Sequence, residues 1–96
     1  MASYFVAHIT ITDPEGYECY LDGFDEVFAR FRGEVVAVDD EAEVHAGTWD
    51  RGRTVSIRVP SEAELLAWYR SPEYQALAEH RRRASTADIA LVHGRR

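Results

Sequence analysis

Residues 4–15 read YFVAHITITDPE, and this stretch decides the fold that we expect for the chain. From Tyr4 to Thr12, apolar residues alternate with mixed ones at a period of two, which predicts a β-strand with one wholly apolar face. Asp13 suits the N-cap of a helix and Pro14 its first position, where proline's missing N–H is not needed. The stretch therefore predicts a strand that passes almost directly into a helix.

The helix that follows has one continuous apolar stripe. Its large side chains recur at helical spacing: Tyr17, Tyr20, Leu21, Phe24, Val27, Phe28 and Phe31. Gly33 is expected to end the helix as its C′ residue. Gly23 lies inside the helix and costs about 1 kcal/mol relative to alanine, which burial of the stripe can offset.

Further strands are predicted at Glu34–Val38, Arg53–Val59 and Ala87–Val92, where apolar residues again alternate with polar or small ones. The acidic turn at 39–41 halts the first of these, and Glu43–Trp49 is a candidate for its continuation. A tight turn at Asp50-Arg51-Gly52 would then join an antiparallel hairpin.

Two helix-start signals predict that a second helix consists of two pieces. Ser61 and Glu64 have the spacing of a capping box, in which the serine caps the helix and the glutamate lies at its third position. Ser71-Pro72 repeats a start signal, and the residue before a proline avoids the helical region, so the helix should break and restart there. Tyr74, in the second piece, is expected to turn back onto the body of the domain.

Residues 1–96 therefore predict a single α+β domain of ferredoxin-like βαββαβ topology, a four-stranded antiparallel sheet with two helices on one face. The helix-covered face would hold Phe5, Ile9, Val55, Ile57, Ile89 and Leu91. The opposite face would hold Val6, His8, Thr10, Ser56, Arg58, Ala90 and Val92. An uncovered face of this mixed kind usually packs against another sheet, so we expect a homodimer.

Composition limits the partners and the compartment. The net charge of −6 argues against general nucleic-acid binding. No apolar run approaches the roughly 18 residues that cross a bilayer, and Met1–Tyr4 lacks the charged start of a signal peptide. The only cysteine, Cys19, excludes an internal disulfide. All basic residues are arginines, which suggests a GC-rich bacterial genome, and we expect a cytoplasmic protein with no membrane partner.

Several of these segments together resemble the bacterial family called domain of unknown function 1330. The resemblance spans nearly the whole chain and rests on Asp13-Pro14-Glu15 with Tyr17 and Tyr20, Gly33, Gly47-Thr48-Trp49 with Arg53, Pro60-Ser61, the run from Trp68 to Gln75, Arg81 and Gly94. The run from Trp68 to Gln75 is its most specific piece.

The resemblance implies a dimeric α/β barrel, in which two ferredoxin-like sheets meet face to face. The wider superfamily includes cofactor-free monooxygenases, isomerases, polyketide cyclases and haem-binding proteins. Members of the family typically carry a glutamate directly before the glycine of the Gly-x-Trp segment, whereas this chain has Ala46. Any chemistry of that carboxylate is either absent here or moved to a neighbour such as His45 or Glu43.

Three residues are candidates for catalysis. His8 would point into the barrel from the middle of a strand, where a near-neutral pKa suits proton transfer, or it is a hydrogen-bonded interface residue. Arg58, on the same face, would bind a carboxylate or enolate oxygen, or form a salt bridge to an acid of the first half. His45 lies beside the altered position, or is simply exposed.

Candidate substrate contacts are drawn from the same face and from an aromatic wall for a flat ligand. They are Tyr4, Thr10, Trp49, Arg53, Ser56, Trp68, Tyr69, Tyr74 and Arg81. Aromatic residues at helical spacing are more often part of a core or of a dimer contact. No histidine or cysteine spacing indicates a metal, and no phosphate-binding loop or nucleophile motif occurs, so neither metal nor cofactor is expected.

Two function classes follow. In one, the chain is a cofactor-independent acid–base enzyme, of the isomerase, cyclase or monooxygenase kind, acting on a small carbonyl or aromatic compound. In the other, it is a non-catalytic small-molecule-binding or assembly module. The fold alone does not choose between them.

Overall fold

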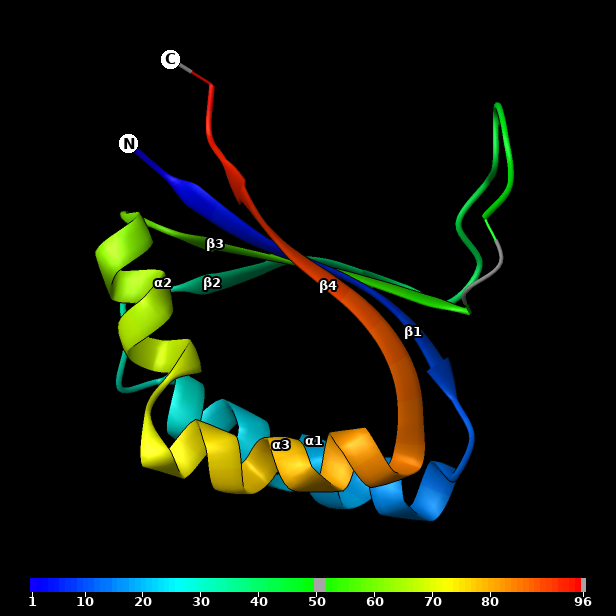
Figure 1. The fold of residues 1–96 in the computed structure, drawn as a ribbon, viewed down its shortest axis with the longest axis horizontal. Coiled ribbons are helices and arrows are strands. Elements are labelled where there is room, and N and C mark those ends of the chain that lie inside the picture. The colour runs from blue at the N-terminus through cyan, green and yellow to red at the C-terminus, as the bar shows by residue number, and fades with distance from the viewer. Residues whose placement is uncertain (50–51, 96) are drawn as a thin grey trace.

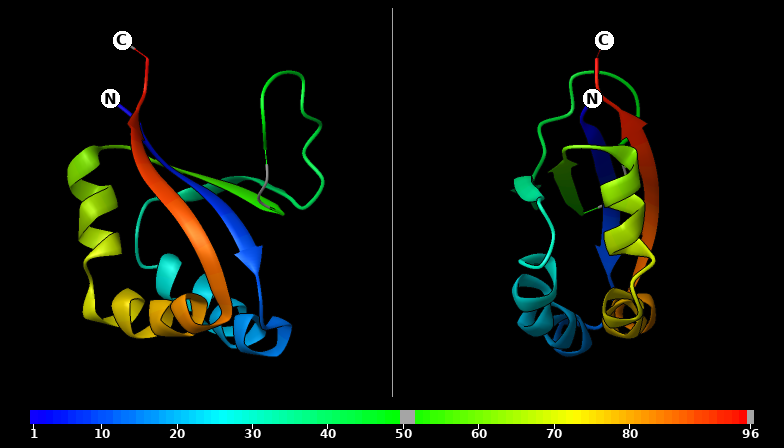
Figure 2. Two further views of the ribbon diagram at one scale, coloured as in Figure 1. Left: turned by 45° about the vertical axis from the view of Figure 1, so that its right-hand side comes forward. Right: turned by 90° about the vertical axis from the view of Figure 1, so that its left-hand side faces the viewer.

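The computed structural model describes residues 1–49 and 52–95 as one sheet with three helices on a single side (Figures 1 and 2). The elements in chain order are β1 (Ser3–Ile11), α1 (Pro14–Phe28), β2 (Glu34–Asp39), β3 (Arg53–Val59), α2 (Glu62–Tyr69), α3 (Pro72–Ala84) and β4 (Ser85–His93). None of these helices is long and apolar enough to cross a membrane in the described part of the chain.

The sheet is antiparallel and its strand order is β2-β3-β1-β4, as a ferredoxin-like fold requires. The first and third strands are central neighbours, and Phe5 of β1 pairs with Ile57 of β3 and with Leu91 of β4. These three side chains share the face that the helices cover, which is the face that alternation predicted. The prediction of an α+β sheet with its helices on one face is thus confirmed.

The second crossover contains two helices where a βαββαβ order has one. The break lies where Ser71-Pro72 predicted it, and both N-terminal serines cap their helices. The Glu64 N–H donates to Ser61 Oγ over 3.3 Å, and the Tyr74 N–H donates to Ser71 Oγ over 3.2 Å. The serine signals therefore produce two short helices set at an angle to each other (Figure 1).

Two local predictions differ from the structure, whereas Asp13 is the N-cap residue of α1 as predicted. Helix α1 ends at Phe28, because the chain tightens there into turns in which Arg30 and Phe31 donate to carbonyls three residues back. Gly33 is therefore not a helix cap; the ring of Phe28 packs where its Cβ would lie. Asp13 makes no side-chain capping bond.

The segment Glu43–Trp49 does not continue the second strand, because β2 ends at Asp39 and the chain leaves the sheet as a loop. The acidic turn at 39–41 begins that loop, with the Glu41 N–H donating to Asp39 Oδ1 over 2.8 Å. The turn predicted at Asp50-Arg51-Gly52 lies largely outside the described residues.

The core is an aromatic cluster under the junction of α2 and α3. Trp68 is fully buried, with its ring centroid 4.4 Å from that of Tyr74, 5.1 Å from Phe5 and 5.2 Å from Phe28. Tyr74 is equally buried, as predicted. These contacts join the helices to the sheet near the start of β1, at one end of the domain.

Helix α1 packs mainly on α3 and makes few contacts with the sheet. Because α1 makes so few contacts with the sheet, the side chains of its apolar stripe only partly fill the space between the helix and the inner face of the sheet. This arrangement leaves a cavity beneath the sheet.

Candidate functional site

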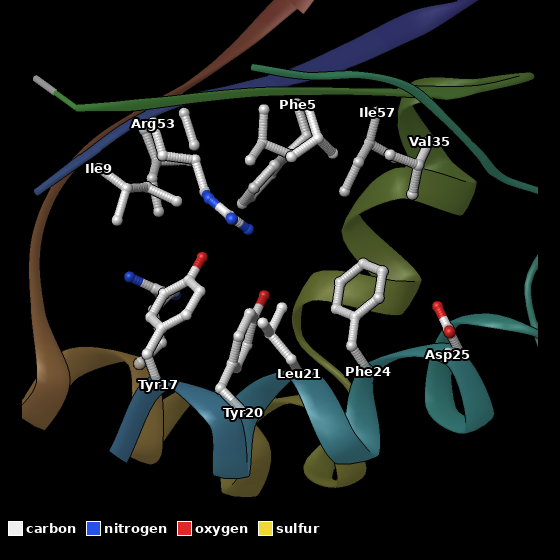
Figure 3. Close-up of a pocket in the computed structure, with 15 residues that line it drawn as sticks. Phe5, Ile9, Tyr17, Tyr20, Leu21, Phe24, Asp25, Val35, Arg53 and Ile57 are labelled. Atoms are coloured by element: carbon white, nitrogen blue, oxygen red, sulfur yellow. The ribbon is translucent and has the colours of Figure 1, made fainter. Parts of the chain in front are cut away.

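A cavity of about 260 Å³ lies between α1 and the inner face of the sheet. Figure 3 shows the side chains that form its walls: Phe5, Ile9 and Ile57 descend from the sheet, and Leu21 and Phe24 rise from α1. Val35 and Val38 of the edge strand β2 complete the apolar lining. A volume of this size takes a small molecule, because a cavity of about 150 Å³ already holds benzene.

One end of the cavity is polar. The hydroxyls of Tyr17 and Tyr20, from α1, point toward the guanidinium of Arg53 at the start of β3 (Figure 3). The guanidinium carbon lies 5.6 Å from the centroid of the Tyr17 ring. Spacing of three residues places both phenols on one side of the helix, so they converge on the same point.

Arg53 is held in place from outside the cavity. Its Nε and Nη2 donate to the two carboxylate oxygens of Asp40 over 2.8 and 3.2 Å. The arginine side chain is 19% exposed, whereas that of Asp40 is 62% exposed. This forked pair orients the guanidinium and leaves Nη1 outside it, available to a group within the cavity.

Tyr20 is fixed by a second buried phenol. Its hydroxyl and that of Tyr74 are 2.9 Å apart, and either can donate to the other. Burial, together with the neighbouring Tyr74, raises the pKa of Tyr20 far above its ordinary value. Burial also raises the pKa of Tyr17, although the charge of Arg53 opposes the rise. Both phenols are therefore neutral hydrogen-bonding groups at physiological pH.

Arg81 of α3 also lines the cavity. It is only 6% exposed, and its Nε has no hydrogen-bond partner. Helix α3 thus contributes a buried cation to the polar end, while α1 contributes neutral hydroxyls.

This geometry suits a flat, largely apolar molecule that carries an oxygen at one end. The apolar walls favour a hydrocarbon body, and the guanidinium and hydroxyl groups favour a carbonyl, enolate or carboxylate oxygen. Negative charge on that oxygen is stabilised more strongly in such a shielded position than in water. The arrangement can bind such a compound and can stabilise its enolate.

His8 and Arg58 lie on the open face of the sheet, away from this cavity. Arg58 pairs with Tyr4 across the strands and His8 pairs with Thr54, so four residues separate them along the sheet, or roughly 13 Å. Arg58 is 3.6 Å from Glu34, a carboxylate of the first half of the chain. A single chain therefore does not bring the two predicted catalytic groups together.

The loop after β2 holds the remaining catalytic candidate. His45 bonds to Glu43 over 2.5 Å, and both side chains are more than four-fifths exposed. Trp49 lies over His8, with 4.1 Å between ring centroids, and donates to Thr54 Oγ1 over 3.2 Å. His8 and Trp49 thus meet on the open face, whereas His45 stays in solvent.

The predicted substrate contacts divide among three places. Arg53 and Arg81 line the cavity. Trp68 and Tyr74 belong to the core, and Tyr69 lines a small groove beside Leu65 and Leu66. The open face or its loop holds Tyr4, Thr10, Ser56 and Trp49.

Sequence reasoning treated Tyr17 and Tyr20 as part of an apolar stripe and missed their place in the cavity. A usable signal was present, because a buried tyrosine hydroxyl needs a hydrogen-bond partner. Two tyrosines one helical turn apart on an inward face therefore indicate polar groups opposite them, which are Arg53 and Tyr74 here.

The fold and the cavity define a ferredoxin-like α+β domain with a cavity under its sheet. The family model for the domain of unknown function 1330 matches residues 2–95, and the chain belongs to that family. The predicted family is thus confirmed. No functionally curated protein matches the chain.

Solved structures support the same fold. A protein of unknown function from Rhodopseudomonas palustris is 18% identical over 99% of this chain and 83% of its own, with a TM-score of 0.79. SnoaB, a cofactor-independent oxygenase from Streptomyces nogalater, is 21% identical over 99% of this chain and 94% of its own, with a TM-score of 0.68. A dimeric ferredoxin-like protein of unknown function from Thermobifida fusca is 15% identical over 98% of this chain and 92% of its own, with a TM-score of 0.69.

Among the described residues, no group of three or more histidine, cysteine, aspartate or glutamate side chains is placed to hold a metal ion. Cys19 is exposed on α1. The expectation of a protein without metal or cofactor stays a prediction.

Proposed function

We propose that the chain is a cofactor-independent acid–base enzyme that acts on a small aromatic or carbonyl compound in the cavity beneath the sheet. The observation that carries the proposal is the convergence of Tyr17, Tyr20 and Arg53 at one end of an otherwise apolar cavity. SnoaB, which shares the fold, acts as an oxygenase without a cofactor and gives the proposal a precedent.

The residues suit enolisation. When a base supplied from the solvent takes a proton from the carbon next to a carbonyl, negative charge grows on the oxygen, and Arg53 with the neutral phenols would stabilise it. Removal of one such donor typically costs a factor of about a hundred or more in rate. The apolar walls lower the polarity around the reacting carbon and so strengthen these interactions.

A second candidate is a binding module without catalysis. It is favoured by the shortage of bases in the cavity, whose described lining contains no histidine and only one carboxylate, Asp25. Asp25 is exposed and lies apart from the polar end (Figure 3). Under this alternative, the cavity would hold the same compounds and leave them unchanged.

Hydrogen exchange distinguishes the two. With α-tetralone in deuterium oxide, the enzyme should speed the exchange of deuterium into the carbon next to the carbonyl, followed by NMR. Arg53→Met should slow this catalysed exchange about a hundredfold, because it removes the main stabiliser of the enolate. Arg70→Met, at an exposed position at the end of α2, serves as the control and should catalyse the exchange as fast as the parent does.

Other outcomes decide against the proposal. Binding of α-tetralone without exchange would establish the binding module. Loss of exchange in Arg58→Met or His8→Gln, but not in Arg53→Met, would move the reaction to the open face of the sheet. That outcome would restore His8 and Arg58 as the candidates for catalysis.

We also infer that two copies pair through the open face of the sheet. This face exposes Ala90 and Val92, the latter to 46%, and a shallow groove runs beside Val6 and His8. Apolar side chains on an uncovered sheet of so small a domain favour association. The related protein from Thermobifida fusca is dimeric.

Light scattering should give twice the chain mass of 10.9 kDa at micromolar concentration. Ala90→Arg places a charge in the middle of the open face and should shift the mass toward one chain, because an unpaired charge is costly inside an interface. Ala67→Arg, on the exposed side of α2, should leave the mass unchanged. A parent protein of single-chain mass would refute the dimer.

A further inference from the structure

Arg81 differs from the other described arginines in being buried without a carboxylate partner. Arg30, Arg32, Arg53, Arg58 and Arg82 each lie within 4.0 Å of a carboxylate, and all are more exposed than Arg81. Arg81 is 6% exposed and forms no ion pair among the residues that the structure describes.

Its neighbours compensate the charge only in part. The groups that act on the Arg81 guanidinium are the phenols of Tyr74, which also hydrogen-bonds to it, Tyr20 and Tyr69, and these are dipoles and not anions. Its Nε makes no hydrogen bond. A cation removed from water without a counter-charge is costly, and proteins normally pair it.

The polar end of the cavity therefore carries an unbalanced positive charge. Of its two cations, Arg53 already has a carboxylate partner, because it forms a forked pair with Asp40. Arg81 faces the same cavity and has no such partner. The negative charge that would balance Arg81 fits best on a molecule bound in the cavity.

We propose that the ligand of this cavity is an organic monoanion, a flat apolar body with one carboxylate or acidic hydroxyl group, whose charge Arg81 balances. This inference rests on the proposed function only in taking the cavity as the ligand site. It adds the charge of the ligand and assigns Arg81 as the residue that selects it.

Matched acids and amides test the charge without changing the protein. Benzoate and cinnamate have the shapes of benzamide and cinnamamide but carry a charge, and binding of all four would be measured by calorimetry and by thermal shift. The acids should bind at least about tenfold tighter than their amides, because a charge-assisted contact to a buried guanidinium is much stronger than a neutral one.

Variants assign the preference to Arg81. Arg81→Met should remove the preference for acids, whereas Arg81→Lys should retain part of it, because the charge remains and the forked geometry is lost. Arg82→Met is the matched control, since Arg82 is next in sequence but exposed and bonded to Glu79 and Gln75. It should bind acids and amides as the parent does.

The outcomes separate this inference from the proposed function. If the amides bind as tightly as the acids, the ligand is not an anion and the inference fails, while the cavity remains a binding site. If acids are preferred but Arg81→Met, shown to be folded by circular dichroism, keeps the preference, the role of Arg81 is refuted. If none of the four compounds binds, both the inference and the proposed cavity site are overturned.

Discussion

Replacing Tyr74 with alanine should lower the free energy of unfolding by about 3–5 kcal/mol, the range for removing a buried aromatic side chain. Tyr74 is fully buried and contacts Trp68, Tyr69 and Tyr20. Its loss opens a void at the junction of α2 and α3 and breaks a buried hydrogen bond. Urea unfolding followed by tryptophan fluorescence measures the change, and a loss of a few tenths of a kcal/mol would contradict the burial.

A double-mutant cycle separates packing from hydrogen bonding. Tyr74→Phe keeps the ring but leaves the Tyr20 hydroxyl unpaired, so it should cost about 1–2 kcal/mol. Adding Tyr20→Phe removes that stranded hydroxyl, and the pair should cost less than the sum of the single changes. Additive costs would show that the two hydroxyls do not interact.

Stability should fall steeply above about pH 10, the ordinary pKa of a tyrosine. Tyr20 has a pKa raised by burial, so the folded state holds its proton where the unfolded chain has lost it. The stabilisation is complete below the unfolded pKa and is lost as pH rises above it. Above that pH, Tyr20 alone should lower the free energy of unfolding by an amount that approaches about 1.4 kcal/mol per pH unit. Tyr17 acts in the same direction.

Urea unfolding of the parent and of Tyr20→Phe at a series of pH values from neutral to alkaline measures this effect. The variant is less stable at neutral pH because Tyr74 loses its partner, but its slope above pH 10 should be shallower by the contribution of one phenol. Equal slopes in the two proteins would show that Tyr20 titrates normally in the folded state.

Much of the fold could be predicted from local patterns. Alternation from Tyr4 to Thr12 located β1 to within a residue at each end, and placed Phe5 and Ile9 on the inner face. Serine-proline at 71–72 located the break between α2 and α3. Such signals are short-range and depend on backbone geometry that the residues themselves dictate.

The end of α1 and the position of the cavity were not predictable in this way. Glycine is the residue type typical of a helix cap, but the role of Gly33 depends on the ring of Phe28, which only tertiary packing brings to it. Periodicity shows which side of α1 is apolar, not how closely that side approaches the sheet. That distance follows from the pairing of α1 with α3, which also makes Tyr17 and Arg53 neighbours.

Helix α1 packs mainly on α3 and lies on the side of the sheet away from the open face. Substitutions at Leu21 or Phe24 would therefore reshape the lining beneath the sheet and leave the residues of the open face untouched. Over evolution, the shape of the cavity could change through this one helix while the open face stays the same.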